Sequence, residues 1–332
     1  MRFSKFLLIV LISTFSLGAE EFSKVGNAGA KFLNIGVSAH AMGMGEAYVA
    51  IANDPSTIFW NPAGIANVKG DAAYIGYTNW IGDIAVPSFS YVKDMGLYGK
   101  LAVMVSGISV GGMQEAVVLT DTTLGQSELT GKEFSYFATQ IGFGFSRYFT
   151  DKFAAGAVVK GIYEGYGSYS HCASFAIDAG TYFWTGFRTL RIAMALQHLG
   201  ADMKPVGTYI LESMQGSQMQ KEEREFESYP LPMVFKVGAA MEVVERPDAK
   251  LTVAIEAAHP TDNTETIALG GELNLKDMIF VRLGYKLADK DTYVCGFGAG
   301  VGIKFRGFQL DYSFSDMTYL PDVHRVGIIY SF

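Results

Sequence analysis

Hydrophobic and polar residues alternate along most of the chain from residue 71 onward. In the segment 278–288 the odd positions are apolar, whereas the even positions include Arg282, Gly284 and Lys286. The segments 307–315 and 323–332 alternate in the same way, with the apolar side chains at even positions. Successive side chains of a strand point to opposite faces, so this period of two predicts strands with one apolar and one polar face.

Such segments repeat until the chain ends. The predicted strands are 71–79, 84–94, 97–109, 133–149, 152–165, 172–185, 188–200, 231–245, 249–259, 263–275, 278–288, 292–305, 307–315 and 323–332. A train of about fourteen strands is typical of a transmembrane β-barrel. We therefore predict an all-β fold, a closed antiparallel barrel with lipid on its apolar face. A soluble sandwich with the apolar face inside is the alternative that alternation alone leaves open.

Both ends of the chain favour the barrel. Arg2 and Lys5 precede an apolar run at 6–12 and a group of small residues, which is the pattern of a secretory signal peptide spanning 1–19. The chain ends on Phe332 inside its last predicted strand, and a terminal aromatic residue there resembles the assembly signal of bacterial outer-membrane proteins. The predicted location is therefore the bacterial outer membrane, with its lipid and the barrel assembly machinery as partners.

The predicted connections alternate in length. Turns such as 150–151 and 276–277 are tight, whereas 110–132 and 201–230 are far longer than ordinary hairpin loops. Short turns on one side and long loops on the other are typical of outer-membrane barrels. An even number of strands then places both ends of the barrel on the side of the short turns.

The stretch 36–64, before the first strand, is dense in Gly, Ala and Met and carries few charges. Its residues 39–51 predict a helix, and Asn53 or Asp54 can cap a second short helix that Asn61-Pro62 ends. A barrel of about fourteen strands encloses more space than its own side chains fill. We therefore predict a helical hatch in the lumen, residues 20–70, followed by the barrel, residues 71–332. A helical pair in a soluble core is the alternative.

Charged residues of both signs fall on the predicted lumen face. Glu272 and Arg282 lie on adjacent strands, as do Asp311 and Arg325. Opposite charges on neighbouring strands predict cross-strand pairs that support the wall. A selectivity ring, the alternative, would normally carry one sign.

Net charge and short motifs exclude several classes of function. The formal charge of −7 argues against nucleic-acid binding, which depends on basic surface. The G-x-S-x-G pattern at 107–111 lacks the strand-to-helix turn of a nucleophile elbow. The alternating glycines of 296–302 lack the helix of a dinucleotide fold, so close packing in the lumen is predicted for them. The histidines show no ligand spacing. We predict no enzyme activity, no cofactor and no metal site.

Two smaller features carry alternatives of their own. Asp289 and Asp291 lie in a predicted outer loop, where a solvated tip is predicted and weak cation binding is the alternative. Cys172 and Cys295 are distant in sequence, and the strand register directs Cys295 towards lipid. We predict that they do not pair, although an oxidising compartment would permit a disulfide bond.

The sequence GVSAHAMGMGEAYVAIANDPSTIFWNPAG at 36–64 and the ending FQLDYSFSDMTYLPDVHRVGIIYSF together resemble the PorV/PorQ family of FadL-like outer-membrane proteins. This resemblance implies a fourteen-stranded barrel with an N-terminal hatch. It also implies that the hatch motif comprises Gly43, Gly45, Asp54, Trp60, Asn61, Pro62 and Ala63. Glu46 departs from the small residue expected there and puts in doubt how tightly the first hatch helix packs.

The resemblance leaves two functions open. The resemblance to PorV implies an accessory barrel of a type IX-like secretion route, which docks secreted protein clients at its outer loops. The resemblance to FadL implies transport of a hydrophobic small molecule, such as a fatty acid, which leaves through a gap in the wall. Transport predicts a kinked strand and an apolar pocket lined by Met42, Met44, Ile58 and Phe59. The secretion role is preferred because that resemblance is closer.

Overall fold

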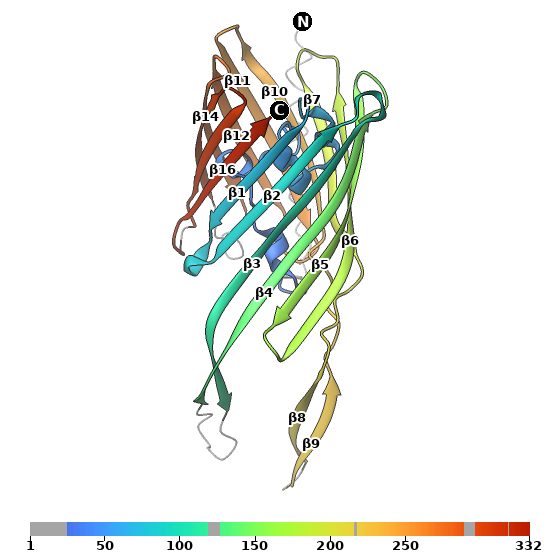
Figure 1. Cartoon of the computed structure of the whole chain (residues 1–332), viewed down its shortest axis with the longest axis vertical. Helices are drawn as coiled ribbons and strands as arrows, with labels where there is room; N and C mark the ends of the chain where they lie inside the picture. Colours follow the sequence, from blue (N-terminus) through green and yellow to red (C-terminus); the bar gives the residue numbers. More distant parts are fainter. Residues whose placement is uncertain (1–24, 119–126, 216–217, 289–295, 318) are drawn as a thin grey trace, which may run out of the picture.

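The computed structural model describes residues 25–118, 127–215, 218–288, 296–317 and 319–332. Fourteen strands form one closed antiparallel barrel (Figure 1). They are β1 (Ala72–Asn79), β2 (Ala85–Asp94), β3 (Lys100–Val118), β4 (Ser127–Tyr148), β5 (Phe153–Tyr166), β6 (Ser170–Trp184), β7 (Arg191–Gly200), β10 (Val234–Glu245), β11 (Ala249–Pro260), β12 (Thr266–Leu275), β13 (Ile279–Leu287), β14 (Phe297–Phe305), β15 (Phe308–Ser315) and β16 (Val323–Ser331).

The barrel closes between its first and last strands. β1 pairs with β16 in a register that runs from Ala72 opposite Ser331 to Asn79 opposite His324. Closure provides hydrogen-bond partners for backbone groups that an open edge would leave unpaired in lipid. The predicted closed barrel is therefore confirmed, and the sandwich alternative is wrong.

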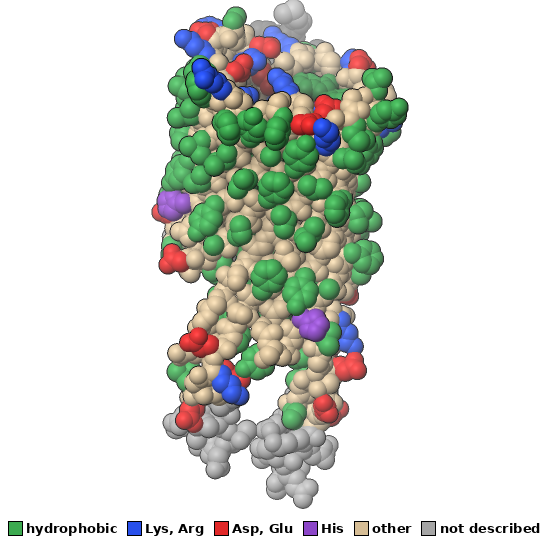
Figure 2. Space-filling model, viewed as in Figure 1, with side chains coloured by type: hydrophobic (Ala, Val, Ile, Leu, Met, Phe, Trp, Pro, Cys, Tyr) green, Lys and Arg blue, Asp and Glu red, His purple; other side chains and the backbone are tan. Residues whose placement is uncertain are grey.

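The two faces of the wall differ as the alternation predicts. On β13, Val281 and Leu283 are exposed on the outside, whereas Arg282 and Lys286 are buried on the inside. Figure 2 shows hydrophobic side chains spread over the outer surface of the barrel, with charged side chains gathered at its upper rim and on its lower projections. An apolar exterior between two charged ends is the surface expected of a barrel in a bilayer.

The two long connections contain more strand than predicted. β3 continues to Val118 and β4 begins at Ser127, so most of the predicted loop 110–132 is a tall hairpin. The connection 201–230 carries a separate hairpin of β8 (Thr208–Gln215) and β9 (Gln218–Glu225). Both project from the same end of the barrel, called here the loop side (Figure 1). Both faces of these projections meet water, so their sequences lack the apolar alternation that identifies the wall strands.

Residues 25–71 form an N-terminal segment that lies inside the barrel (Figure 1). Its helical turns are η1 (Lys31–Asn34), α2 (Ala39–Gly43), η2 (Pro55–Phe59) and η3 (Pro62–Asn67), and η4 (Ile81–Asp83) and η5 (Gly96–Tyr98) lie in later turns. Within the described ranges, no helix is long and apolar enough to span a bilayer.

The first helix is much shorter than predicted. Its start is capped by Ser38, whose hydroxyl accepts the Ala41 N–H, but the helix ends at Gly43 instead of continuing to Ile51. Gly45 and Glu46 then adopt left-handed backbone angles, with φ of 63° and 74°. Left-handed residues terminate a right-handed helix. The backbone thereby turns towards the wall.

Candidate functional site

Inward-facing glycines of β12, β13 and β14 hold the N-terminal segment against the wall. A Cβ on Gly284 would lie 2.1 Å from the backbone carbon of Met44, and one on Gly298 would lie 2.4 Å from the Met42 carbonyl oxygen. Gly300 similarly faces the Cα of Gly43, at 3.1 Å from an added Cβ. Because side chains would occupy this slot, glycine is required for the two backbones to meet. The close packing predicted for the glycines of β14 is present at Gly298 and Gly300.

A buried polar network fastens the same part of the segment. His40 Nδ1 lies 2.8 Å from Asp54 Oδ2, and His40 Nε2 lies 2.9 Å from Glu272 Oε2 on β12. The Tyr48 hydroxyl donates to Asp54 over 2.7 Å. Burial and nearby Arg282 lower the pKa of His40, but the two carboxylates outweigh them and raise this pKa to about 9. His40 is therefore a cation held between two anions at neutral pH.

The network continues into the wall through Arg282. Its Nε bonds Glu272 over 2.7 Å, which is the predicted cross-strand pair, and its Nη1 bonds Asp311 on β15 over 2.5 Å. Asp311 was predicted to pair with Arg325, but its Oδ1 bonds Arg282. Arg325 Nε donates to the Gly36 carbonyl over 2.7 Å. Each of these four charged side chains is buried. The lumen charges thus join four wall strands, β12, β13, β15 and β16, to the N-terminal segment.

Further wall side chains bond the segment's backbone. Glu256 on β11 accepts the N–H groups of Tyr48 and Val49, at 2.9 and 2.8 Å. Lys286 on β13 bonds Glu46 over 2.7 Å. Glu46, the departure from the family pattern, therefore has a cationic partner in the wall. The alternation places Glu256 on the lumen face, but its bonds were not predicted, because its partners are backbone groups some two hundred positions away, which leave no pattern in the side chains.

The residues of the predicted hatch motif make local caps and wall contacts. Asp54 caps η2 by accepting the Ser56 N–H, and Asn61 caps η3 by accepting the Ala63 N–H. The Asn61 amide also donates to the Val49 carbonyl over 3.0 Å. A Cβ on Gly180 of β6 would lie 2.0 Å from Asn61 Oδ1. Asn61 therefore joins three parts of the chain, and Pro62 provides the fixed φ that begins η3.

Two cavities lie on opposite sides of this segment. The loop-side cavity has a volume of about 400 Å³ and contacts Met42, Phe59, Trp60, Trp80 and Lys236, among others. The other, of about 270 Å³, is polar, faces the short turns and includes His40, Asn53 and Lys304 in its lining. The segment therefore stands between the two ends of the lumen.

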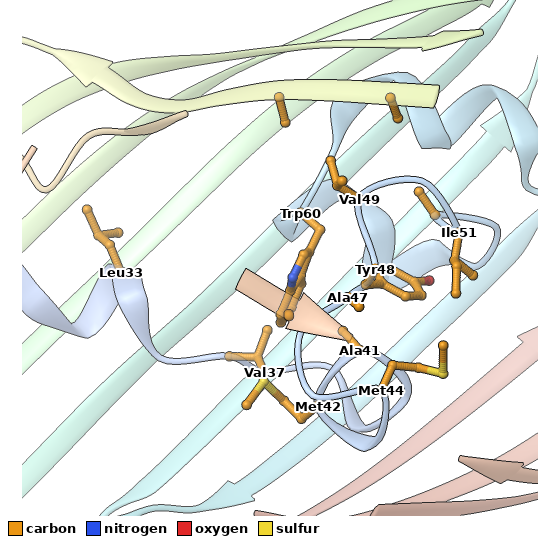
Figure 3. Packing of buried hydrophobic residues seen from close by; sticks show 14 of the residues in the cluster. Leu33, Val37, Ala41, Met42, Met44, Ala47, Tyr48, Val49, Ile51 and Trp60 are labelled. Carbon is orange, nitrogen blue, oxygen red and sulfur yellow. The ribbon is translucent and has the colours of Figure 1, made fainter. Parts of the chain in front are cut away.

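The predicted apolar pocket is divided by the structure. Met42 and Phe59 line the loop-side cavity. Met44 instead lies against Gly270 and Gly284 of the wall, and Ile58 packs in a separate cluster of buried side chains. Figure 3 shows Met42 and Trp60 within the buried side chains of the N-terminal segment, and Trp60 makes an edge contact with Tyr48. The centre of the lumen thus combines apolar packing with the polar network.

The wall contains an interruption between β2 and β3. Their pairing ends at Ser88 opposite Ser106. Beyond this point, residues 85–87 of β2 pair only with β1, and residues 107–118 of β3 pair only with β4. Pro87 lies at the interruption and has no N–H to donate to a neighbouring strand. We call this interruption the notch.

An apolar groove of about 540 Å³ lies at the notch. Its outer rim contains the lipid-facing side chains Ile75, Phe89, Val105 and Phe137. Its floor contains lumen-facing residues, Gly76, Ser88, Ser106 and Ile108. Residues from both faces of one wall line a common groove because the strands separate there. The notch is therefore a place where the outside and the interior of the barrel approach each other.

The remaining predicted site residues lie elsewhere. Cys172 is buried with its Sγ 3.1 Å from the Tyr229 hydroxyl, whereas Cys295, Asp289 and Asp291 lie outside the described residues. Phe332 is exposed at the turn side, where its ring contacts Tyr91 and Tyr330. Within the described part of the chain, no cluster of His, Cys, Asp and Glu has the arrangement of a metal site.

No protein-family model matches the chain, and no curated protein matches it. Solved structures with the same fold include the toluene transporter TbuX of Ralstonia pickettii, at TM-score 0.56 and 12% identity over 89% of this chain and 97% of that chain. The CymD monoaromatic hydrocarbon channel has TM-score 0.58 and 12% identity over 90% and 98%. A Pseudomonas aeruginosa FadL homologue has TM-score 0.54 and 11% identity over 89% and 98%. The chain therefore has the FadL-type barrel fold.

These likenesses correct the preferred functional prediction. TbuX and CymD are a transporter and a channel for hydrocarbons, and they match the alternative prediction better than a secretion role. The prediction of a client-docking accessory to a type IX-like route is therefore wrong. It depended on the stretch before the first strand and on the last strands. These regions form the N-terminal segment inside the lumen and the closure of a FadL-type barrel, so they do not distinguish a secretion accessory from a transporter.

Proposed function

We propose that this protein is a FadL-like transporter for hydrophobic small molecules in the bacterial outer membrane. The observation that carries the proposal is the combination of a blocked lumen with a groove at the notch whose rim is apolar. The loop-side cavity offers Met42, Phe59 and Trp80 to an apolar molecule, but the N-terminal segment stands between it and the turn-side cavity. A molecule that enters the lumen has the notch as an apolar way out.

In this proposal residues 20–70 act as the hatch, residues 71–332 form the barrel, and 1–19 is the signal peptide. The glycine slot and the network around His40 hold the hatch against β12 to β15. A fixed hatch prevents free flow of water and ions, while at the notch lumen-facing and lipid-facing residues line one groove that an apolar molecule can occupy. Transfer to lipid is favourable for apolar surface, at about 25 cal/mol per Å². Membership in the PorV/PorQ family remains a prediction from the two ends of the sequence. We do not infer a secretion role from it.

Filling the groove tests the proposal. The double variant Ala85→Phe/Ser109→Phe places two rings on groove-lining, outward-facing positions. Cells that lack other transporters of this kind would express each form, and uptake of p-xylene from water would be measured. We expect uptake to fall severalfold in the filled variant.

The matched control is Ala299→Phe, an outward position that faces Leu283 on β13. It adds the same ring to the lipid face far from the groove, and uptake should stay at the wild-type rate. Uptake equal to that of cells without the protein, or unaffected by filling the groove, would contradict transport through the notch.

A further inference from the structure

The floor of the groove is polar, although its rim is apolar. One row of lumen-facing positions crosses the wall through Ser88, Ser106 and Gln140, which oppose one another in the register of β2, β3 and β4. All three side chains are at least nine-tenths buried. Ser88 and Ser106 line the groove directly. A purely hydrocarbon ligand would leave this row without any new partner.

Gln140 and Ser106 have unused hydrogen-bonding capacity. Gln140 Nε2 donates to Ser106 Oγ over 2.9 Å. Gln140 Oε1 has no hydrogen-bond partner among the residues that the structure describes. The bond occupies an acceptor site of Ser106 and leaves its hydroxyl hydrogen for another acceptor. If the amide is rotated, the pair still presents one unused group. Leaving such buried groups without partners is unfavourable.

The groove also carries no charge. Its lining consists of apolar residues, glycines, serines and one threonine, Thr139, whose hydroxyl donates to the Ser106 carbonyl over 3.1 Å. An ionised ligand group would lose its hydration there without gaining a counter-charge. A neutral hydroxyl, in contrast, can accept from Ser106, which lines the groove, and donate to Gln140, which lies beside Ser106 on β4.

We propose that the notch is a binding site for lipophilic molecules that carry one neutral polar group, a phenol or an alcohol, with Ser106 and Gln140 as the residues that select it. This inference rests on the proposed transport function and names the class of molecule that the wall groove prefers. The rim holds the apolar body, and the floor bonds the hydroxyl. Discrimination comes from pairing polar groups that a hydrocarbon leaves unpaired.

Two ligands of nearly the same shape test the selection. p-Cresol and p-xylene differ by a hydroxyl in place of a methyl group, and a phenol is neutral at pH 7. Their binding to the full chain in lipid nanodiscs would be measured by equilibrium dialysis and corrected with empty nanodiscs. We expect roughly tenfold tighter binding of p-cresol, the factor of one good hydrogen bond. p-Toluate, which is ionised, should bind more weakly than p-xylene.

The variants Gln140→Leu and Ser106→Ala should each remove most of the preference for p-cresol while keeping p-xylene binding. The control Ser313→Ala deletes another buried lumen hydroxyl, on β15, and should retain the preference. Two variants are used so that one misfolded form does not decide the result. The groove-filled variant Ala85→Phe/Ser109→Phe should lose both ligands.

Equal binding of the two ligands by the wild type would overturn the selection, as would a preference that persists in both variants. Occupation of the groove by a lipid acyl chain would give no groove-dependent binding of either ligand and would also overturn it. The first two results leave p-xylene uptake by cells unaltered, so failure of the selection is distinguishable from failure of the transport proposal, which that uptake measures.

Discussion

Two parts of the barrel's inner wall face the same lumen but are built differently. The anchoring wall, the inward faces of β12 to β15, combines glycines with buried ion pairs and holds the N-terminal segment. The notched wall, the inward faces of β1 to β4 around Ser88 and Ser106, carries small neutral hydroxyls and an interrupted strand pair. Buried ion pairs on the anchoring wall keep the N-terminal segment fixed. On the notched wall, neutral hydroxyls with few partners leave hydrogen-bonding groups available to a ligand.

The largest effect should come from breaking the anchoring wall at Arg282. Arg282→Met leaves Glu272 and Asp311 as buried carboxylates that have lost their shared cation. Removing one partner of a buried ion pair costs about 3 to 5 kcal/mol. We expect a loss of this size in the free energy of unfolding, measured by urea titration in lipid vesicles. A loss below about 1 kcal/mol would mean that the network does not hold the wall together.

His40 makes the same wall depend on pH. Its pKa is about 9 in the folded protein and about 6.5 in the unfolded chain, so folding binds a proton between these pH values. The stabilisation is complete below pH 6.5 and is lost as pH rises through 9. The full difference corresponds to about 3 kcal/mol. Unfolding of the wild type and of His40→Gln should be compared from pH 6 to 10, and the gap between them should narrow with rising pH. A gap that is constant over this range would contradict the charged state.

A smaller loss is expected from filling the glycine slot. Gly284→Ala places a methyl group where the Met44 backbone lies, 2.1 Å away, so the segment must shift. Overpacking of this kind costs about 1 to 3 kcal/mol. The displaced segment should also raise ion conductance in planar bilayers. The control Gly161→Ala meets no atom within 4 Å and should leave the conductance unchanged.

The smallest effect is expected on the notched wall. Thr78 on β1 is buried, and its hydroxyl has no hydrogen-bond partner within the described ranges. Thr78→Val removes that hydroxyl at constant shape, so the free energy of unfolding should stay within about 0.5 kcal/mol or rise slightly. A loss comparable with that of Arg282→Met would erase the difference between the two walls.

The wall strands could be predicted because lipid on one side and a polar lumen on the other impose a strict alternation on their residues. The same physics explains the errors, since the described side chains of β8 and β9, at 208–210 and 222–225, are all exposed and these strands lack this alternation. Asp54 was predictable as a cap because its partner lies two residues away, whereas Asn61-Pro62, predicted to end a helix, begins η3 instead, with Asn61 as its cap.

The contacts that fix the N-terminal segment depend on the register of distant strands. Glu256 accepts the Tyr48 N–H only because β11 lies beside the N-terminal segment, and no local sequence pattern predicts that bond. The notch is similar. Pro87 inside a predicted strand indicates a weakened edge, but the point at which β2 and β3 separate follows from the register of the whole wall.

The seam between β1 and β16 also has a consequence for biogenesis. β1, which follows the N-terminal segment, can pair with its second neighbour, β16, only after the last residues of the chain have been made. Part of the contacts that seat this segment, those around His40 and the glycines, come from β12 to β15, which are also made late. Insertion of the segment and sealing of the cylinder therefore belong to the same final stage of maturation, and a truncated chain would complete neither.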